Sequence, residues 1–325
     1  MTDKQNQIED LNQYLALNDA LEQAKRQIDE ALSSAPVLIR QFTKYLTESR
    51  GKYIRARALL ICAMADSGLI HTDAVKCAAA VEILHLATLV HDDVIDDAAV
   101  RRGKLTLQKK FGKKTAVICG DYLFCLALSL VAAVNNREEY ADLKVPDYIS
   151  RICLGELNQH INNDNLDLTV RTYLKIISGK TAALFEACFF TGSILCKQDE
   201  KAIKSYKKLG RSIGMIFQLT DDCIDFEENE GAAKKTVQSD YEQGVITLPL
   251  IHTLKELPLK EKAKDRKMTR SEINKAVKKS GGISFTKGIA NKYYDRSMAI
   301  IDGLDPAEAK RAGLIEILDK ASRII

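Results

Sequence analysis

Two short acidic clusters are the residues in this chain with the greatest capacity for chemistry. Residues 92–96 and 221–225 share the spacing Asp-Asp-x-x-Asp, and most of the residues around them are apolar. Adjacent aspartates repel one another and disfavour a helix, so a counter-charge must offset them. Carboxylate oxygens suit Mg²⁺, which keeps several waters and commonly shares its coordination shell with substrate phosphates. The pair of clusters therefore predicts Mg²⁺ sites that hold a diphosphate, although one cluster alone would fit a solvated acidic surface equally well.

Helical periodicity joins other polar side chains to the aspartates. Side chains three and four residues apart share a helix face, with Cβ atoms roughly 5 to 6 Å apart. The resulting groups are His85, Thr88, Asp92 and Asp96 in the first helix and Gln218, Asp221 and Asp225 in the second. Each helix is therefore expected to present carboxylates on a surface flanked by core residues.

Basic residues that could bind phosphates gather in three places. Residues 101–114 contain seven bases and no acid: Arg101, Arg102, Lys104, Lys109, Lys110, Lys113 and Lys114. A second basic group spans residues 50–57, and Lys180 stands between apolar segments. Arginine forks and helix N-termini both favour phosphate oxygens. A single lysine is equally compatible with a solvated surface charge, and Lys180 with a side chain that reaches to the surface.

The segments that must position these residues have helical periodicity. The expected helices cover residues 8–32, 36–48, 55–66, 73–97, 115–134, 146–163, 171–196, 200–226, 240–255, 270–280 and 283–300, and loops are expected near 135–137, 162–165, 227–238 and 255–270. Apolar residues recur there at spacings of three and four. Only five prolines interrupt 325 residues, of which 46% are hydrophobic. These features predict an all-α fold in a single domain.

Composition excludes several functional classes. A net charge of +4 is too balanced for a general nucleic-acid binder. The eight cysteines include no Cys-x-x-Cys pair and fall mostly in apolar stretches, so they are expected to be reduced, buried side chains. No run approaches the 18 to 20 or so uncharged apolar residues of a membrane span, and the N-terminus lacks an apolar signal region. We therefore expect a cytoplasmic protein without a transmembrane segment.

Taken in order, these motifs resemble the trans-isoprenyl diphosphate synthase, or polyprenyl synthetase, family over most of the chain. The matching elements are Gly51-Lys52-x-x-Arg55, Glu82-x-x-His85, Leu89-Val90-His91-Asp92-Asp93-x-x-Asp96, Arg101-Arg102-Gly103, Gly120-Asp121-Tyr122-Leu123, Gly179-Lys180-Thr181, Phe217-Gln218-x-x-Asp221-Asp222-x-x-Asp225 and Thr247-Leu248-Pro249. So many ordered elements make a chance match very improbable.

The resemblance assigns a role to each candidate site residue. It implies that Asp92, Asp96 and Asp221 are the leading Mg²⁺ ligands, supported by Asp93, Asp222 and Asp225, with two or three ions bound together with the diphosphate. The residues implied to bind isopentenyl diphosphate are Lys52, Arg55, His85 and Arg102. Those implied to hold the allylic diphosphate are Arg101, Lys180 and Lys235, with Thr181 and Gln218 beside its reacting end. The residues expected to act in catalysis are Asp92, Asp96, Lys180 and Asp221.

The implied activity is Mg²⁺-dependent prenyl transfer. The allylic diphosphate ionises, the isopentenyl double bond attacks the allylic cation head to tail and in trans, and a proton is lost. Charge stabilisation of the departing diphosphate would be the main catalytic contribution. The implied fold is an isoprenoid synthase-type helical bundle, residues 1–325, around a central active-site cavity that keeps water from the cation. The resemblance also implies a homodimer, with a small regulatory subunit as a possible partner.

Two departures from the family pattern concern diphosphate binding. Tyr53 and Ala56 stand where relatives usually carry another base and a proline, and residues 244–247 lack a lysine that many relatives have. The segment around Lys235 matches only in part. These differences put in doubt the strength of allylic-diphosphate binding and leave the reaction class unchanged.

Product length is expected to depend on the helix before the first acidic cluster. In the family, bulky residues four or five positions before the first aspartate stop chain growth, and here those positions hold Thr88 and Ala87. We therefore hypothesise a medium- or long-chain product. If Leu84, Phe124 or Leu126 closes the tunnel, the product would be geranylgeranyl diphosphate.

Several rival functions share part of this pattern. A di-iron bundle uses Glu-x-x-His twice, whereas this chain has the motif once, at Glu82 and His85. A phosphohydrolase of the HD type is disfavoured because His85 and His91 fall on different helix faces. A class I terpene cyclase would not need Lys52 and Arg55. An inactive subunit that pairs with an active partner is disfavoured by the presence of both acidic clusters.

Overall fold

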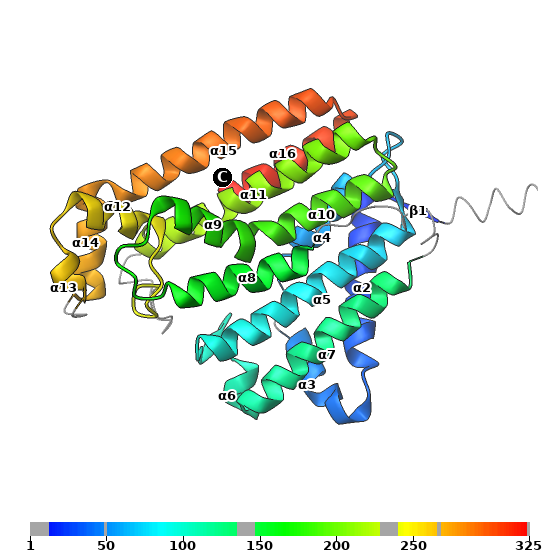
Figure 1. The fold of residues 1–325 in the computed structure, drawn as a ribbon. Coiled ribbons are helices and arrows are strands. Elements are labelled where there is room, and N and C mark those ends of the chain that lie inside the picture. Colours follow the sequence, from blue (N-terminus) through cyan, green and yellow to red (C-terminus); the bar gives the residue numbers. More distant parts are fainter. Residues whose placement is uncertain (1–12, 49–50, 135–146, 228–239, 265–267, 324–325) are drawn as a thin grey trace, which may run out of the picture. The chain divides into compact units, whose positions relative to one another are not determined.

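The computed structural model describes residues 13–48, 51–134, 147–227, 240–264 and 268–323 (Figure 1). Most of these residues are helical and almost none are in strands, which confirms the all-α prediction. Within the described ranges the only sheets are two short antiparallel pairs, β1 (Tyr14–Leu15) with β2 (Ile70–His71) and β3 (Val100–Arg101) with β4 (Lys104–Leu105).

The chain divides into two compact units, which are described separately. The first contains Met1–Val145, Cys188–Tyr206 and Asp305–Leu314, and the second contains Pro146–Ala187, Lys207–Leu304 and Ile315–Ile325. Helices α10 (Ala182–Leu195), α11 (Glu200–Glu227) and α16 (Glu308–Ser322) contribute residues to both. The single-domain organisation and the central cavity expected from the sequence remain predictions.

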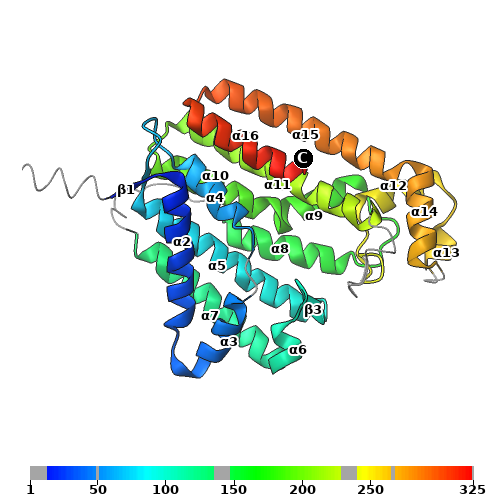
Figure 2. The same ribbon diagram turned by 180° about the vertical axis from the view of Figure 1, so that it is seen from behind.

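In the first unit, α5 packs along α7. The helices of this unit are α2 (Leu17–Ser33), α3 (Val37–Thr47), α4 (Ile54–Cys62), α5 (Thr72–Ile95), α6 (Leu107–Phe111) and α7 (Lys113–Ala132) (Figure 2). Ile83 and Val90 of α5 are buried with Leu123 of α7, and each such side chain contributes roughly 1.5–3 kcal/mol. Gly120 permits the close approach, because a Cβ there would lie 2.3 Å from Nε2 of His91. The packing holds the first acidic cluster at the C-terminal end of α5.

In the second unit, α8 and α9 cross at two glycines. The helices that lie wholly in this unit are α8 (Tyr148–Ile161), α9 (Val170–Lys180), α12 (Leu248–Glu256), α13 (Lys260–Lys264), α14 (Arg270–Ser280) and α15 (Gly282–Leu304). A Cβ on Gly155 would lie 2.2 Å from the main-chain nitrogen of Lys180, and one on Gly179 would lie 2.8 Å from the carbonyl oxygen of Arg151. The glycines therefore allow the backbone that carries Lys180 to lie directly against α8.

Local signals explain where several helices begin. Thr269 and Glu272 form a capping box at α14, and Gly281 ends that helix in the left-handed region. His71 caps α5 by accepting a hydrogen bond from the Asp73 N–H through Nδ1 at 3.2 Å.

Some of the expected helix boundaries were wrong. The helix expected over 171–196 is two helices, α9 and α10, separated at Thr181, and the one expected over 240–255 begins only at Leu248. Gly244 has a φ of 81° and Pro249 lies in the first turn of α12, so the residues before Leu248 do not continue a helix. Helices α6, α13 and α16 were not expected.

Two helices in the described part of the chain, α5 and α7, are long and apolar enough to cross a membrane when judged by length and composition alone. Core helices of soluble proteins meet the same test, and half of the apolar window of α5 is buried within the protein. That helix also carries Glu82, Asp92 and Asp93. The expected absence of a transmembrane segment stays a prediction.

The α8–α9 crossing predicts opposite effects for two glycine-to-alanine changes. Gly155→Ala should lower the free energy of unfolding by about 1–3 kcal/mol, because the new methyl group collides with the backbone of α9. Gly288 of α15 is the matched control, since a Cβ there meets nothing within 4 Å. Gly288→Ala should raise the free energy of unfolding by roughly 0.5–1 kcal/mol. Urea unfolding followed by circular dichroism measures both, and a shift in the same direction would contradict the packing described.

Candidate active site

The first acidic cluster lies at the end of α5. Asp92 and Asp93 are in the last turn, and Asp96 is the C-cap residue, whose N–H donates to the carbonyl oxygen of Asp92. Asp92 and Asp96 are partly exposed, whereas Asp93 is buried. The two carboxylates predicted to be leading metal ligands are therefore accessible, and the middle one faces the protein.

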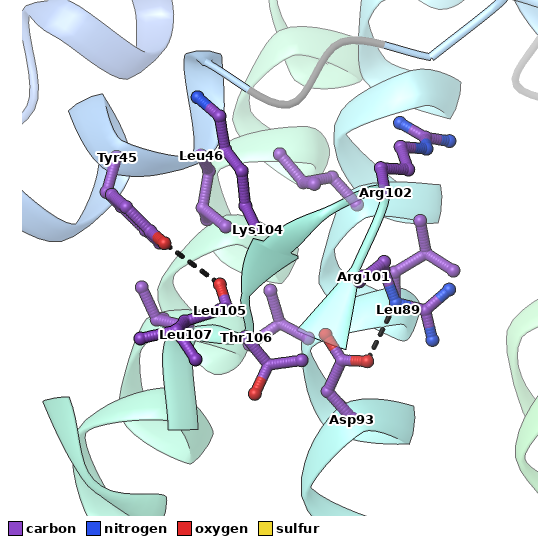
Figure 3. Close-up of a pocket in the computed structure, with 12 residues that line it drawn as sticks. Tyr45, Leu46, Leu89, Asp93, Arg101, Arg102, Lys104, Leu105, Thr106 and Leu107 are labelled. Atoms are coloured by element: carbon purple, nitrogen blue, oxygen red, sulfur yellow. Dashed lines mark hydrogen bonds and ion pairs between the residues drawn. The ribbon is translucent and has the colours of Figure 1, made fainter. Parts of the chain in front are cut away.

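Asp93 pairs with Arg101 across the start of a hairpin. Nε of Arg101 donates to Oδ1 of Asp93 at 2.7 Å (Figure 3). Burial raises the pKa of Asp93, and the nearby Arg101 guanidinium opposes that rise. The ion pair ties strand β3 to the acidic helix, so in this arrangement Asp93 positions Arg101. Its supporting role in metal binding stays a prediction.

The β3–β4 hairpin presents Arg102 in a strained turn. Arg102 has a φ of 52° and Gly103 a φ of 78°, as the two central residues of a tight hairpin turn require. Figure 3 shows Arg101 turned toward Asp93, whereas Arg102 points away from it. The Arg102 guanidinium lies against Gly51, where a Cβ would be 3.2 Å from Nη2.

Arg102, Arg55 and His85, which the resemblance assigns to isopentenyl diphosphate, lie in one basic cluster. They are close enough that the charges of Arg55 and Arg102 act on His85. Removal from water lowers the pKa of His85 well below its ordinary value, and the two arginines lower it further. His85 is therefore neutral near pH 7 and can donate or accept a hydrogen bond. Lys52 lies three residues before Arg55 and is exposed.

Glu82 holds this cluster in place. Its Oε1 accepts the N–H of Ala56 at 2.9 Å, at the start of α4, where the main chain enters from Tyr53 in the left-handed region. Burial raises the pKa of Glu82, while the Ala56 N–H and the Arg55 charge oppose this. Glu82 thus fixes the helix end that carries Arg55.

Two adjoining pockets of the first unit open beside these residues. One is lined by Gly51, Tyr53, Glu82, His85 and Arg102, with apolar residues of α2 and α5 around them. The other is lined by Asp93, Arg101, Arg102 and Lys104 together with Tyr45, whose hydroxyl donates to the Leu105 carbonyl oxygen at 2.9 Å (Figure 3). Arg102 lines both, so one guanidinium can contact an anion in either pocket.

Other bases of residues 101–114 have structural partners. Lys109 and Lys113 bind Asp97, at 3.2 and 2.9 Å, and lower the pKa of its carboxyl to about 2. Lys104 binds Glu48 at 3.0 Å, and Lys110 lies 3.8 Å from the centre of the Tyr45 ring. These lysines therefore fit the interpretation of solvated surface charges. Arg101 and Arg102 remain the leading anion-binding residues of the segment.

In the second unit, a chain of hydrogen bonds orients the second acidic cluster. Thr181 Oγ1 donates to Gln218 Oε1 at 2.7 Å, and Gln218 Nε2 donates to Asp222 Oδ1 at 2.7 Å. The Tyr173 hydroxyl donates to Oδ2 of Asp222. Burial raises the pKa of Asp222 to about 7, with its two hydrogen-bond donors opposing the rise. The structure thus brings Thr181 and Gln218 together, and both oxygens of Asp222 accept hydrogen bonds.

The remaining carboxylates of this cluster, those of Asp221 and Asp225, contact arginine side chains, and Asp225 also accepts a main-chain N–H. Asp221 accepts from Nη2 of Arg323 at 2.6 Å, and Asp225 contacts Nη2 of Arg270 at 3.4 Å. Asp225 also accepts the N–H of Asp240 at 3.3 Å. Burial and the three neighbouring aspartates raise the pKa of Asp240 well above its ordinary value. Four carboxyl groups therefore share one region, where a divalent cation would relieve their repulsion.

Lys180 lies at the end of α9 and pairs with Glu156 of α8. Its Nζ is 2.9 Å from a carboxylate oxygen of Glu156. The charge of Lys180 also acts on Asp240, which places the lysine near the acidic region. Lys235, the remaining predicted residue, lies outside the described residues.

The donor set fits Mg²⁺ bound jointly with a diphosphate. Within the described ranges, no three His, Cys, Asp or Glu side chains are grouped closely enough to form a metal site by themselves. Asp92, Asp96 and Asp221 nevertheless offer accessible carboxylate oxygens, and Mg²⁺ is usually bound by one or two carboxylates together with phosphates and water.

Several residues of this site were not given a role from the sequence, among them Glu82 and Tyr173. Glu82 was noted only as half of a motif, and its capping of α4 depends on a contact over 26 residues. Tyr173 is 49 residues from Asp222 in sequence. The sequence could have indicated Tyr173 only through its position two turns before Lys180, on the same face of α9.

Comparison with known proteins agrees with these observations. A family profile described as polyprenyl synthetase matches residues 36–280. Heptaprenyl diphosphate synthase component 2 of Bacillus subtilis (strain 168) is 31% identical over 303 residues, which cover 91% of this chain and 86% of that protein. Octaprenyl diphosphate synthase of Escherichia coli (strain K12) is 35% identical over 234 residues, which cover 69% of each.

A solved structure shows the same likeness in three dimensions. The crystal structure of heptaprenyl diphosphate synthase from Staphylococcus aureus has a TM-score of 0.84 and 30% sequence identity, and it covers 95% of this chain and 98% of that one. The resemblance drawn from the motifs is thereby confirmed. This chain belongs to the polyprenyl synthetase family of trans-isoprenyl diphosphate synthases.

Proposed function

We propose that this chain is an Mg²⁺-dependent prenyltransferase that condenses isopentenyl diphosphate with an allylic diphosphate. The observation that carries this proposal is the cluster of Arg55, His85 and Arg102, which lies on and around the helix that ends in Asp92 and Asp96. His85 precedes Asp92 by seven residues, which is about 10 Å along the same helix face. One diphosphate can therefore bind at the basic cluster while another binds at the carboxylates.

Each residue then has a defined part in the reaction. Arg55, Arg102 and neutral His85 bind and orient isopentenyl diphosphate, with Glu82 fixing the start of α4. Arg101 and Lys180 hold the allylic diphosphate as it departs. Mg²⁺ bound to Asp92, Asp96 and Asp221 would supply Lewis-acid neutralisation of the departing diphosphate. The Thr181 and Gln218 pair, held by Asp222, places fixed dipoles beside the allylic cation.

We propose a medium- or long-chain product. The relatives named above are heptaprenyl and octaprenyl diphosphate synthases. Ala87 is fully buried in the core of the first unit, whereas Thr88 and Leu84 lie one turn apart on the partly exposed face of α5. Thr88 is therefore the better candidate for setting product length, with geranylgeranyl diphosphate as the alternative if Leu84 closes the path.

We also propose that the active form is a homodimer. Val117, Leu128 and Val131 of α7 share one face and are 40%, 52% and 49% exposed. Exposed apolar side chains on one helix face are typical of protein interfaces. One relative is named as a component of its enzyme, so a small second subunit is the other candidate partner. A cytoplasmic location is proposed as well, which the free thiols of all eight cysteines support.

Removing the carboxylates tests the proposed reaction. Asp92→Ala and Asp221→Ala should each lower kcat/KM for prenyl transfer by roughly 100-fold or more. The reason is that the Mg²⁺ that would neutralise the departing diphosphate loses a carboxylate ligand. Because both clusters serve one reaction, the double variant should lose much less than the product of the two single effects. Asp66→Ala, an exposed change outside the site, is the control. Unchanged activity in the double variant would overturn the assignment.

A bulky residue on α5 tests the product-length proposal. Thr88→Phe should shorten the product, because its ring would occupy the face along which the chain extends. Thr88→Ser is the matched control, since it keeps the hydroxyl that donates to the His85 carbonyl oxygen at 2.8 Å. Thin-layer chromatography of the dephosphorylated products compares the two. Identical product lengths in both variants would exclude Thr88 as the determinant.

A charge on the exposed face of α7 tests the dimer. Leu128→Asp should convert the purified chain from dimer to monomer at micromolar concentration, as measured by size-exclusion chromatography with light scattering. Leu38→Asp is the control, because Leu38 of α3 is 89% exposed on a different helix. A dimer that survives Leu128→Asp, or a wild-type monomer, would argue against this interface.

A further inference from the structure

Lys310 is a buried lysine away from the acidic clusters. It lies in the first unit, on α16, with 2% of its surface exposed. Its Nζ donates to the Met64 carbonyl oxygen at 3.0 Å and to Cys196 Sγ at 3.6 Å, and lies 5.1 Å from the centre of the Tyr206 ring. A buried ammonium group is costly unless it is paired, and these contacts offset that cost.

Cys196 completes this arrangement. It follows the end of α10, and its Sγ donates to the same Met64 carbonyl oxygen at 3.1 Å. Thus an amine and a thiol share one acceptor and contact each other. Cys196 is partly exposed, unlike the buried Cys62 that lies near it.

Part of this geometry has a structural explanation. Met64 follows the C-terminal end of α4, where a cation favourably meets the helix dipole. That explains Lys310 beside Met64. It does not require a thiol within contact of the ammonium, at a cysteine that is partly exposed.

We propose that Cys196 and Lys310 form a peroxide-dependent covalent link, a sulfenamide between Sγ and Nζ. A thiolate is the form of cysteine that attacks peroxide. Sulfenic acids condense with nitrogen nucleophiles at contact distance. The contact at 3.6 Å supplies that nucleophile before oxidation begins.

The two steps balance with hydrogen peroxide as the oxidant. The Cys196 thiolate attacks one peroxide oxygen, the O–O bond breaks, and the departing hydroxide takes a proton from the Lys310 ammonium to become water. The neutral Nζ then attacks the sulfur of the sulfenic acid. The N–S bond forms, the S–O bond breaks, and hydroxide leaves with the proton displaced from nitrogen as a second water. Sulfur is oxidised by two electrons and the peroxide is reduced to water.

The link would close a large loop of the chain. Cys196 and Lys310 are 114 residues apart in sequence, and the loop contains the second acidic cluster. Joining residues so far apart restricts the unfolded chain, so the oxidised protein resists unfolding more strongly. A thiol reductant reverses the link, so the added resistance to unfolding would respond to the redox state of the cell.

The test uses the full chain with its exposed cysteines replaced, Cys125→Ser and Cys153→Ser. After treatment with hydrogen peroxide, intact mass under non-reducing conditions should fall by about 2 Da, and dithiothreitol should restore it. Non-reducing digestion should yield a cross-linked pair of peptides that contain Cys196 and Lys310. Cys62→Ala should leave this product unchanged, because Cys62 takes no part in it.

Two lysine variants separate the proposed link from other oxidation. Lys310→Arg keeps a cation but should abolish the cross-link and leave a sulfenic acid that dimedone traps. Lys320→Arg, on the same helix and paired at the surface with Glu316, should cross-link as the parent does. A dimedone adduct or a sulfinic acid on Cys196 without the cross-linked peptides would overturn the proposal, as would a disulfide between Cys196 and Cys62.

Discussion

The arrangement of side chains around the two acidic clusters depends on the repulsion among carboxylates that lie on apolar helices. Each unit of the chain reduces this repulsion by turning one aspartate inward and giving it donors. Asp93 receives the Arg101 guanidinium, and Asp222 receives Gln218 and Tyr173. The outer carboxylates stay accessible. A divalent cation bridged to a diphosphate is the ligand that would relieve the remaining charge while using those oxygens.

The packing of the helices fixes where these charged side chains lie. Close packing at Gly120 holds the acidic end of α5, and the crossing at Gly155 and Gly179 fixes the backbone of Lys180. Among the basic residues, Glu82 fixes the start of the helix that carries Arg55. The β3–β4 turn directs Arg102 away from Arg101, which binds Asp93. Glu82 and the hairpin turn thus hold Arg55 and Arg102 apart from the aspartates of the first acidic cluster, whereas Arg101 pairs with Asp93.

Sequence reasoning recovered the parts of the site that follow from helical spacing or from ordered motifs. The spacing of Gln218 to Asp221 and Asp225, and the motif positions of Arg55, His85 and Arg102, needed no tertiary information. Tyr173 and Glu82 gained their roles through contacts between distant segments, which spacing on one helix does not reveal. The break at Thr181 was missed because apolar residues recur at helical spacing on both sides of it and no glycine or proline follows it directly.

The acidic clusters are proposed to bind a diphosphate together with Mg²⁺. Isothermal titration calorimetry of the purified chain with inorganic diphosphate, with and without Mg²⁺, measures this binding. Binding should be at least about tenfold tighter with Mg²⁺, because the metal would supply positive charge between the carboxylates and the diphosphate. Binding of equal affinity without the metal would contradict this proposal.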